Sequence, residues 1–243
     1  MDQLVDNNTR IWFDASLLRE DPTQCFDVEF WQQKDAIIGS ATGRGTTWFV
    51  QTEVLPAALR HYRRGGLFGK LVRDSYAFTG WGNTRSAQEF QLLTYLREKG
   101  ISVPRPIAAR AIRDGLTYQA DLLVEKIDDA KDLVDILMEA PLDASHYHRI
   151  GVMVRKLHDA GVCHTDLNIH NILLDTTGTC WLIDFDKCGK KEGESWKVSN
   201  LSRLLRSFRK ELNKRHIQWQ ESDWDALLLG YQEQGHQEQG HQE

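Results

Sequence analysis

The sequence of 243 residues has no long hydrophobic run. No stretch approaches the roughly 18 consecutive uncharged apolar residues that a membrane-spanning helix needs. Residues 1–6 also lack the basic region and the apolar region of a secretory signal peptide. We therefore expect neither a membrane-spanning helix nor a signal peptide.

Cysteine is scarce, and its spacing is uninformative. The four cysteines, Cys25, Cys163, Cys180 and Cys188, form no C-x-x-C pair, so neither a zinc site nor a disulfide framework is expected. Reduced thiols of a cytoplasmic enzyme are the plain expectation. The apolar content is ordinary for a globular enzyme with a sizeable core, and the length allows one large domain or two closely joined lobes.

Positive charge is in the minority but unevenly distributed. The formal net charge is −5, yet residues 60–73 contain five basic residues and no acidic one. Residues 197–216 contain seven basic residues and one acidic residue, Glu211. The seven are Lys197, Arg203, Arg206, Arg209, Lys210, Lys214 and Arg215. This segregation predicts contact with an anion or an anionic surface.

Two segments carry the residues expected to do chemistry. The run His164–Asn171 has the pattern H-x-D-x-x-x-x-N, and Asp184-Phe185-Asp186 begins thirteen residues after Asn171. Protein kinases carry the same parts as H-R-D-x-x-x-x-N and D-F-G. We expect Asp166 to accept the proton of an attacking hydroxyl group. Asn171 and Asp184 would hold Mg²⁺, which prefers oxygen ligands and shares them with phosphates.

The sequence around these motifs predicts a hairpin. Residues 172–174 and 180–183 are apolar strands, and 175–179 form the turn between them. Such a hairpin would bring Asp184 beside Asn171. The alternative is that Asp166 and Asp184 are turn or capping residues on a β-rich surface.

The N-terminal half contains a possible phosphate-binding turn. Gly43 and Gly45 belong to a glycine-rich segment, 39–45, that precedes a β-branched and aromatic strand. Glycines allow backbone N–H groups to approach phosphate oxygens closely, so both are candidate ATP-binding residues. A simple glycine-containing hairpin would give the same pattern.

A cation that would hold the ATP phosphates is expected shortly afterwards. The strand at 57–62 corresponds to the kinase strand V-A-I-K, with Arg60 in the position of the lysine. Lys70 is the alternative, and Arg60 can also be one more member of the basic segment. Glu89, near the start of a helix over 86–96, is expected to pair with Arg60 or Lys70, unless it is a solvated residue that favours the helix N-terminus.

Adenine binding is expected at the end of the next strong strand. This strand, 122–127, would lead into the connection between two lobes, where backbone groups of Glu125 and Ile127 contact the base. Backbone contacts leave no side-chain pattern, so this prediction rests on position alone.

The segment after the motifs bears on the substrate. Only 59 residues follow Asp184, and they contain no activation segment or A-P-E element of the kind that protein kinases use to dock a polypeptide. We expect a small molecule or a lipid headgroup as acceptor, and neither a protein substrate nor nucleic acid. The helix expected over 201–215 combines an apolar stripe with a basic face, as in helices that bind membrane surfaces. The stripe can equally be a core contact.

Taken together, the sequence resembles a known family, the 3-deoxy-D-manno-octulosonic acid (Kdo) kinases of Gram-negative bacteria. These group with the lipopolysaccharide core heptose kinases in the protein-kinase-like superfamily. The resemblance covers about residues 30–215 and is carried by four segments: 43–49, 59–67 (L-R-H-Y-R-R-G-G-L), 164–171 and 183–187.

The resemblance implies an activity and a location. The family uses ATP and Mg²⁺ to phosphorylate the 4-hydroxyl of Kdo on a lipid A precursor, at the cytoplasmic face of the inner membrane. The resemblance therefore implies two partners, the lipid A precursor and the anionic membrane surface. It also implies that the protein is a peripheral membrane protein. Three positions depart from the wider kinase pattern. They are Asp186 in place of the D-F-G glycine, Arg60 in place of lysine, and Asn168 where protein kinases carry a lysine.

The predicted fold is α+β, a bilobal protein-kinase-like arrangement. Residues 1–127 would form an antiparallel β-rich N-lobe, and 128–230 a shortened, mainly helical C-lobe. Residues 231–243 contain near copies of one pentapeptide and are expected to be disordered. Alternative functions are a heptose kinase, an aminoglycoside- or choline-type kinase, and a pseudokinase that binds nucleotide or lipid without turnover.

Overall fold

The chain forms two compact units. The computed structural model describes residues 1–42, 45–64 and 74–239, with the backbone alone for 234–239. Unit 1 comprises Met1–Thr94 and Pro104–Asp128, and unit 2 comprises Tyr95–Val103 and Asp129–Glu243. Unit 1 is rich in strands and unit 2 is mainly helical, so the fold class is α+β, as predicted.

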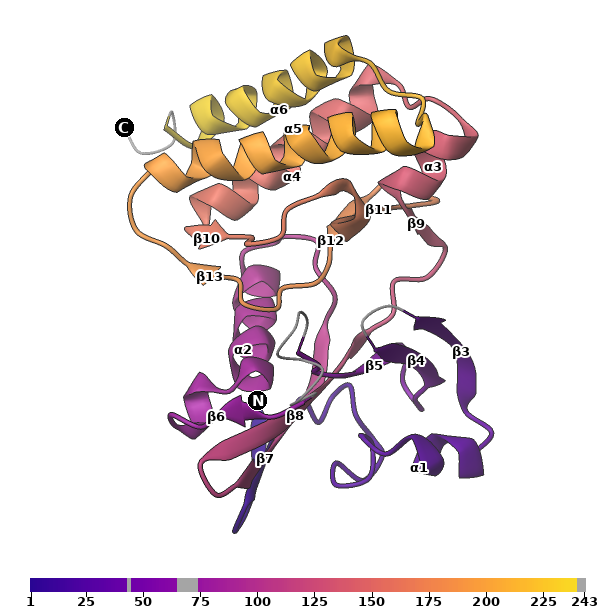
Figure 1. The fold of residues 1–243 in the computed structure, drawn as a ribbon, viewed down its shortest axis with the longest axis vertical. Helices are drawn as coiled ribbons and strands as arrows, with labels where there is room; N and C mark the ends of the chain where they lie inside the picture. The colour runs from indigo at the N-terminus through magenta and orange to yellow at the C-terminus, as the bar shows by residue number, and fades with distance from the viewer. Residues whose placement is uncertain (43–44, 65–73, 240–243) are drawn as a thin grey trace. The chain divides into compact units, whose positions relative to one another are not determined.

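Unit 1 is built on an eight-stranded sheet in which all pairs are antiparallel (Figure 1). The order is β1 (Asp2–Asp6), β2 (Thr9–Phe13), β7 (Pro106–Asp114), β8 (Thr117–Glu125), β5 (Pro56–His61), β4 (Thr46–Gln51) and β3 (Ile37–Thr42), with β6 (Tyr76–Ala77) paired to β8. Strands β5 and β8 confirm the strands predicted near 57–62 and 122–127.

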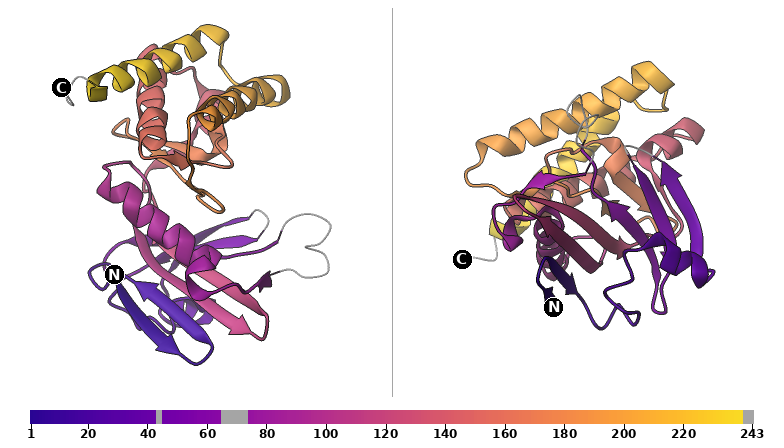
Figure 2. Two further views of the ribbon diagram at one scale, coloured as in Figure 1. Left: turned by 90° about the vertical axis from the view of Figure 1, so that its left-hand side faces the viewer. Right: turned by 60° about the horizontal axis from the view of Figure 1, so that its bottom comes forward.

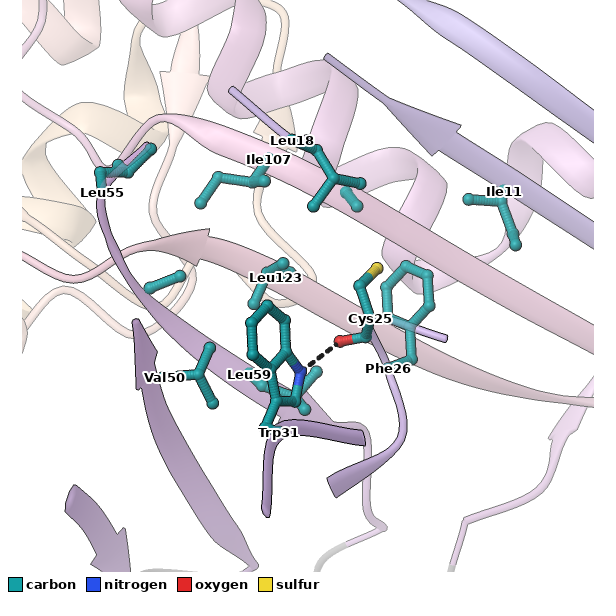
Figure 3. Close-up of a cluster of buried hydrophobic side chains, with 12 residues drawn as sticks. Ile11, Leu18, Cys25, Phe26, Trp31, Val50, Leu55, Leu59, Ile107 and Leu123 are labelled. Atoms are coloured by element: carbon teal, nitrogen blue, oxygen red, sulfur yellow. Dashed lines mark hydrogen bonds between the residues drawn. The ribbon is translucent and has the colours of Figure 1, made fainter. Parts of the chain in front are cut away.

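Successive side chains along a strand point to opposite faces of a sheet, and the strands of this sheet contribute buried side chains to two separate clusters. Both faces of the sheet are therefore covered. Helix α1 (Val28–Gln33) and the segment before it cover one face, where Trp31 donates a hydrogen bond of 2.9 Å to the carbonyl oxygen of Cys25 (Figure 3). Helix α2 (Arg85–Glu98) covers the other face through Phe90 (Figure 2), after the short helix η2 (Trp81–Asn83). The helix predicted over 86–96 is therefore confirmed.

Unit 2 combines helices with two small antiparallel sheets. The helices are α3 (Leu133–Glu139), α4 (Ala144–Asp159), α5 (Ser195–Arg215), α6 (Glu221–Gln239) and the short η3 (Ile169–Asn171). One sheet has the order β12 (Cys180–Leu182), β11 (Ile172–Asp175) and β9 (Ala130–Asp132), and the other pairs β10 (Val162–Cys163) with β13 (Gly189–Lys190). The hairpin predicted after Asn171 is present.

Segment 95–103 belongs to unit 2, although its place in the chain put it in the predicted N-lobe. Hydrogen bonds explain the difference. The hydroxyl of Tyr95 donates to the carbonyl of Ala160 over 3.1 Å, and the carbonyl of Ser102 accepts from the N–H of Leu182 over 3.0 Å. The boundaries of the two lobes remain our prediction.

Helices α4 and α6 cross at two glycines. A Cβ atom on Gly151 would lie 1.9 Å from the carbonyl oxygen of Leu227, and one on Gly230 would lie 2.1 Å from that of His148. Real Cβ atoms cannot approach a backbone oxygen so closely. Glycine at both positions therefore allows the two helix backbones to pack in direct contact.

The last turns of α6 differ from the expected disorder after residue 230. The backbone is helical as far as Gln239. Two side chains of α6 are hydrogen bonded to α4: the Tyr231 hydroxyl lies 2.8 Å from His158 Nδ1, and the Glu233 carboxylate lies 2.8 Å from His148 Nε2. Glutamine and glutamate are also good helix formers.

The apolar stripe of α5 is a core contact. Leu204 and Phe208 are fully buried, and Phe208 stacks on Trp219 with ring centroids 5.3 Å apart. These two residues of the stripe expected to contact a membrane are thus covered by protein. Among the described residues, no helix combines the length and apolarity needed to cross a membrane.

Candidate active site

A buried histidine joins the two motif segments of unit 2. His164 is completely buried, and its Nε2 lies 3.0 Å from the carbonyl oxygen of Ile183. A carbonyl oxygen only accepts, so Nε2 carries the proton. Burial lowers the pKa of His164 below its ordinary value. The ring also packs edge-on against Phe185, with centroids 4.8 Å apart, so His164 fixes the Asp184 segment against the loop that contains Asp166.

Asp166 is held by two amide side chains. Nδ2 of Asn171 and Nδ2 of Asn168 each donate to the backbone carbonyl of Asp166 over 2.9 Å. The amide of Asn171 therefore keeps its Oδ1 as an oxygen ligand, and Asn171 itself is 9% exposed. The side chain of Asp166 is 51% exposed, which leaves its carboxylate accessible to a hydroxyl group of an acceptor.

Asp184 lies next to Asn171 in an unusual backbone conformation. The N–H of Ile183 donates to the carbonyl oxygen of Asn171 over 3.0 Å, which is the proximity that the predicted hairpin required. Asp184 has φ = 61°, in the left-handed region that non-glycine residues adopt at a cost of roughly 1–2 kcal/mol. Residues held in that region cluster at functional sites.

The donor set suits Mg²⁺. Asn171 offers an amide oxygen and Asp184 a carboxylate, and Mg²⁺ is usually bound by one or two carboxylates, with water and substrate phosphates completing its octahedron. Within the described residues, no cluster of three or more His, Cys, Asp or Glu side chains forms a site for another metal. These residues would therefore bind magnesium together with ATP.

Helix α5 runs alongside residues 164–171, the candidate catalytic loop. Asn200 Nδ2 donates to the carbonyl of His164 over 2.7 Å, and the N–H of Ile169 donates to Ser207 Oγ over 3.2 Å. Between these anchors, Arg203 Nη1 lies 3.5 Å from Asp166 Oδ1. From the sequence, Arg203 was only one member of the basic face of this helix, and its contact with Asp166 was not predicted. The polar residues Asn200 and Ser207, on the same side of the helix, are the signal that could have located this contact.

The anchor at Asn200 continues into the core of unit 2. His158 Nε2 lies 3.0 Å from Asn200 Oδ1, and its Nδ1 lies 2.8 Å from the hydroxyl of Tyr231. Because Oδ1 only accepts, Nε2 donates. The ring is neutral near pH 7 because of the lowered pKa given next, so Nδ1 accepts from the Tyr231 hydroxyl. Burial lowers the pKa of His158 to about 4. Helices α4, α5 and α6 are thus connected to the catalytic loop through hydrogen bonds.

Unit 1 contains the expected ion pair. Arg60 on β5 and Glu89 on α2 are 2.5 Å apart between Nη2 and Oε1. Glu89 is 4% exposed and also accepts a hydrogen bond from the hydroxyl of Tyr62. The carboxylate is therefore satisfied from two sides, and it holds the guanidinium of Arg60 at a defined position.

The other predicted ATP-binding residues differ in whether the structure describes them and in what they contact. A Cβ atom on Gly45 would lie 3.0 Å from Cδ of Arg63, whereas Gly43 and Lys70 lie outside the described residues. The carboxylate of Glu125 binds Arg105 at 2.9 Å, and the backbone N–H of Glu125 donates to the carbonyl of Arg105. Among the described residues no hydrogen bond engages the N–H of Ile127, so this group is the better candidate for a backbone contact with adenine.

Comparison with known proteins agrees with this arrangement. The profile of the lipopolysaccharide kinase (Kdo/WaaP) family matches residues 28–231. The chain belongs to this family. The matched region includes every residue that we assigned to ATP, metal or catalysis.

Curated members of the family resemble the chain over nearly its full length. A 3-deoxy-D-manno-octulosonic acid kinase of Photobacterium profundum is 62% identical over 232 residues, which are 96% of this chain and 98% of the relative. The protein of the same name from Vibrio parahaemolyticus is 61% identical over 226 residues, 93% of this chain and 94% of the relative. That of Haemophilus influenzae is 49% identical over 239 residues, 95% and 99% of the two chains.

Proposed function

We propose that this protein is a Kdo kinase, which transfers the terminal phosphoryl group of ATP to the 4-hydroxyl of Kdo on a lipid A precursor. The observation that carries the proposal is the hydrogen-bonded arrangement of Asp166, Asn171 and Asp184 in unit 2. It occurs in a chain that is 62% identical to a protein named for this activity.

In the proposed reaction, the acceptor hydroxyl donates its proton to Asp166 while its oxygen attacks the terminal phosphorus. The bond between that phosphorus and the bridging oxygen breaks, and ADP leaves with the electron pair. Arg60, positioned by Glu89, binds the ATP phosphates with the backbone of Gly43 and Gly45. Asn171 and Asp184 would hold magnesium, which would neutralise charge on the phosphates. Positioning and charge neutralisation supply most of the rate enhancement.

Product analysis with several acceptors tests the proposal. Purified protein is incubated with ATP, Mg²⁺ and a Kdo-bearing lipid A precursor, and in parallel with heptose-bearing lipid, an aminoglycoside and choline. We expect phosphate on the 4-hydroxyl of Kdo alone. Transfer to another acceptor would reassign the substrate, and nucleotide binding without any transfer would indicate a pseudokinase.

The metal ligands are tested by titration with Mg²⁺. We expect Asp184→Asn and Asn171→Ala to need more Mg²⁺ for half-maximal turnover, with partial rescue by Mn²⁺. Asparagine tolerates the left-handed conformation found at position 184, so the first variant keeps the fold. Metal titrations that overlay the wild type would make both residues structural.

We also propose peripheral attachment to the anionic cytoplasmic face of the inner membrane. The exposed basic residues Arg206, Lys210 and Lys214 follow one another at intervals of four along α5 and so share one side of the helix. Because Leu204 and Phe208 of the apolar stripe of α5 are buried, we expect this attachment to be mainly electrostatic. Each basic residue near an anionic leaflet contributes about 1 kcal/mol.

Vesicle co-sedimentation tests the attachment. Binding to vesicles that contain phosphatidylglycerol should weaken as salt rises, because exposed charges are screened within about 10 Å at 0.1 M salt. Neutralising Arg206, Lys210 and Lys214 together should cost on the order of 3 kcal/mol of binding. The control variant neutralises three exposed lysines elsewhere, Lys34, Lys99 and Lys131. Equal binding by the two variants would remove α5 from the membrane contact.

A further inference from the structure

The catalytic loop contains no lysine or arginine beside its aspartate. Asn168 stands two residues after Asp166, and its amide donates to the Asp166 carbonyl and accepts from the N–H of His170. The ring of His170 lies near the carboxylates of Asp132 and Glu211, at 3.6 and 3.5 Å. The cation that the structure places at the carboxylate of Asp166 comes from α5. It is Arg203, at 3.5 Å.

The backbone beneath Arg203 is fixed to the catalytic loop on both sides. Asn200 and Ser207, about one turn before and one turn after Arg203, are hydrogen bonded to His164 and Ile169. These two hydrogen bonds fix the position of the helix relative to the loop, and Arg203 therefore lies opposite Asp166.

The guanidinium of Arg203 is also accessible. The side chains of Arg203 and Asp166 are 49% and 51% exposed, and they are 3.5 Å apart, which is longer than a charge-assisted hydrogen bond of about 2.7–2.9 Å. Arginine has five N–H donors arranged as a planar fork. A contact this long with one carboxylate leaves donors for a second anion.

We propose that Arg203 binds the carboxylate of the acceptor and thereby selects a sugar acid over a neutral sugar; this assignment rests on the proposed function. The reacting hydroxyl must lie within hydrogen-bonding distance of Asp166, so a cation at the same carboxylate is next to the acceptor. The substrate named for the relatives is an acid, and its carboxylate matches the guanidinium fork bidentately. Arg206 continues the positive charge one turn further along α5.

The test compares a charged acceptor with a neutral one. The probes are a soluble methyl glycoside of Kdo and the methyl ester of the same compound, which lacks the negative charge. For wild type we expect kcat/KM to be about 10- to 100-fold higher with the acid, the value of a charge-assisted hydrogen bond. In Arg203→Gln this preference should fall to about twofold or less, because kcat/KM for the acid should fall further than kcat/KM for the ester. Arg203→Lys should keep part of the preference.

The control is Arg209→Gln on the same helix, because the guanidinium of Arg209 binds Glu221 at 2.9 Å through two nitrogens and does not contact the loop in the described structure. It should retain the full preference. A preference that stays unchanged in Arg203→Gln would overturn the assignment. This includes the case in which kcat/KM falls by the same factor with both acceptors, which would indicate a role on the phosphoryl group or in folding. No transfer to either acceptor by wild type would overturn the proposed function and this assignment with it.

Discussion

At the scale of single residues, the proposed chemistry depends most on Asp166. Its backbone is fixed by Asn168 and Asn171, while its carboxylate is half exposed. We predict that Asp166→Ala lowers kcat by roughly 10²–10⁴-fold, the contribution of a positioned base, and leaves the affinity for ATP unchanged. Single-turnover kinetics and nucleotide titration measure the two effects. Asp225→Ala, an exposed aspartate on α6, is the control. Turnover near the wild-type rate would exclude Asp166 as the base.

Arg60 offers a second residue-scale prediction. Its ion pair with buried Glu89 orients the guanidinium, and so we expect Arg60→Ala to raise the KM for ATP more than Lys70→Ala does. Glu89→Gln should raise the KM less than Arg60→Ala, because Arg60 keeps its charge and loses only an ionic partner. Steady-state kinetics at varied ATP decide the order. A larger effect at Lys70 would transfer the phosphate-binding role to that residue.

The residues that sequence reasoning could reach are those with distinctive chemistry at fixed spacing. Asp166, Asn171 and Asp184 follow the motif, and the Glu89 partner followed from helix position. Asn200, Ser207 and His158 carry no motif, because their roles depend on which helix packs against the catalytic loop. The contact of Arg203 with Asp166 was not predicted for the same reason: a helical pattern separates polar from apolar faces but does not identify the neighbour of each.

At the scale of secondary-structure elements, the crossing of α4 and α6 is the most exacting contact. We predict that Gly151→Ala destabilises the protein by roughly 1–3 kcal/mol or more, the usual cost of overpacking, since the new methyl group would meet the carbonyl of Leu227. Urea unfolding measures the change. Gly82→Ala is the matched control, because a Cβ atom there has no neighbour within 4 Å. Equal stability of the two variants would contradict the close crossing.

Elements were more predictable than their packing. Short apolar runs and the turn at 175–179 were sufficient to predict the strands of the motif hairpin, and apolar spacing was sufficient for α2. From the sequence, the glycine at 151 only indicates a residue that disfavours a helix. The close approach of α6 explains why glycine is needed there. Residues 231–239 look unstructured by composition, whereas their backbone continues α6, which is tied to α4 through Tyr231.

At the scale of the whole molecule, the two units should respond to pH in opposite directions. The hydrogen bond that His61 donates to Asp121, and then the one that it donates to Asp74, raise the pKa of His61 in unit 1 above its ordinary value of 6.5. Its stabilising contribution is therefore complete below pH 6.5 and lost as pH rises through the raised pKa. Burial lowers the pKa of His158 in unit 2 to about 4. Between pH 6.5 and pH 4, His158 is protonated in the unfolded chain and neutral in the folded one. Unit 2 therefore loses stability as pH falls through this range.

Hydrogen exchange, corrected for the intrinsic rate at each pH, can follow both units in one sample. Between pH 8 and pH 5 we expect α4 and α6 to lose roughly 2 kcal/mol of protection through His158, while β5 and β8 gain protection through His61. His158→Gln should flatten the pH dependence in unit 2 and leave that of unit 1 intact, and His61→Gln should do the reverse. Within unit 2, the catalytic loop should lose protection together with α4 and α6, because Asn200 bonds both His158 and the carbonyl of His164. Exchange in α4 and α6 that does not change with pH would show that His158 titrates alike in the folded and unfolded chains.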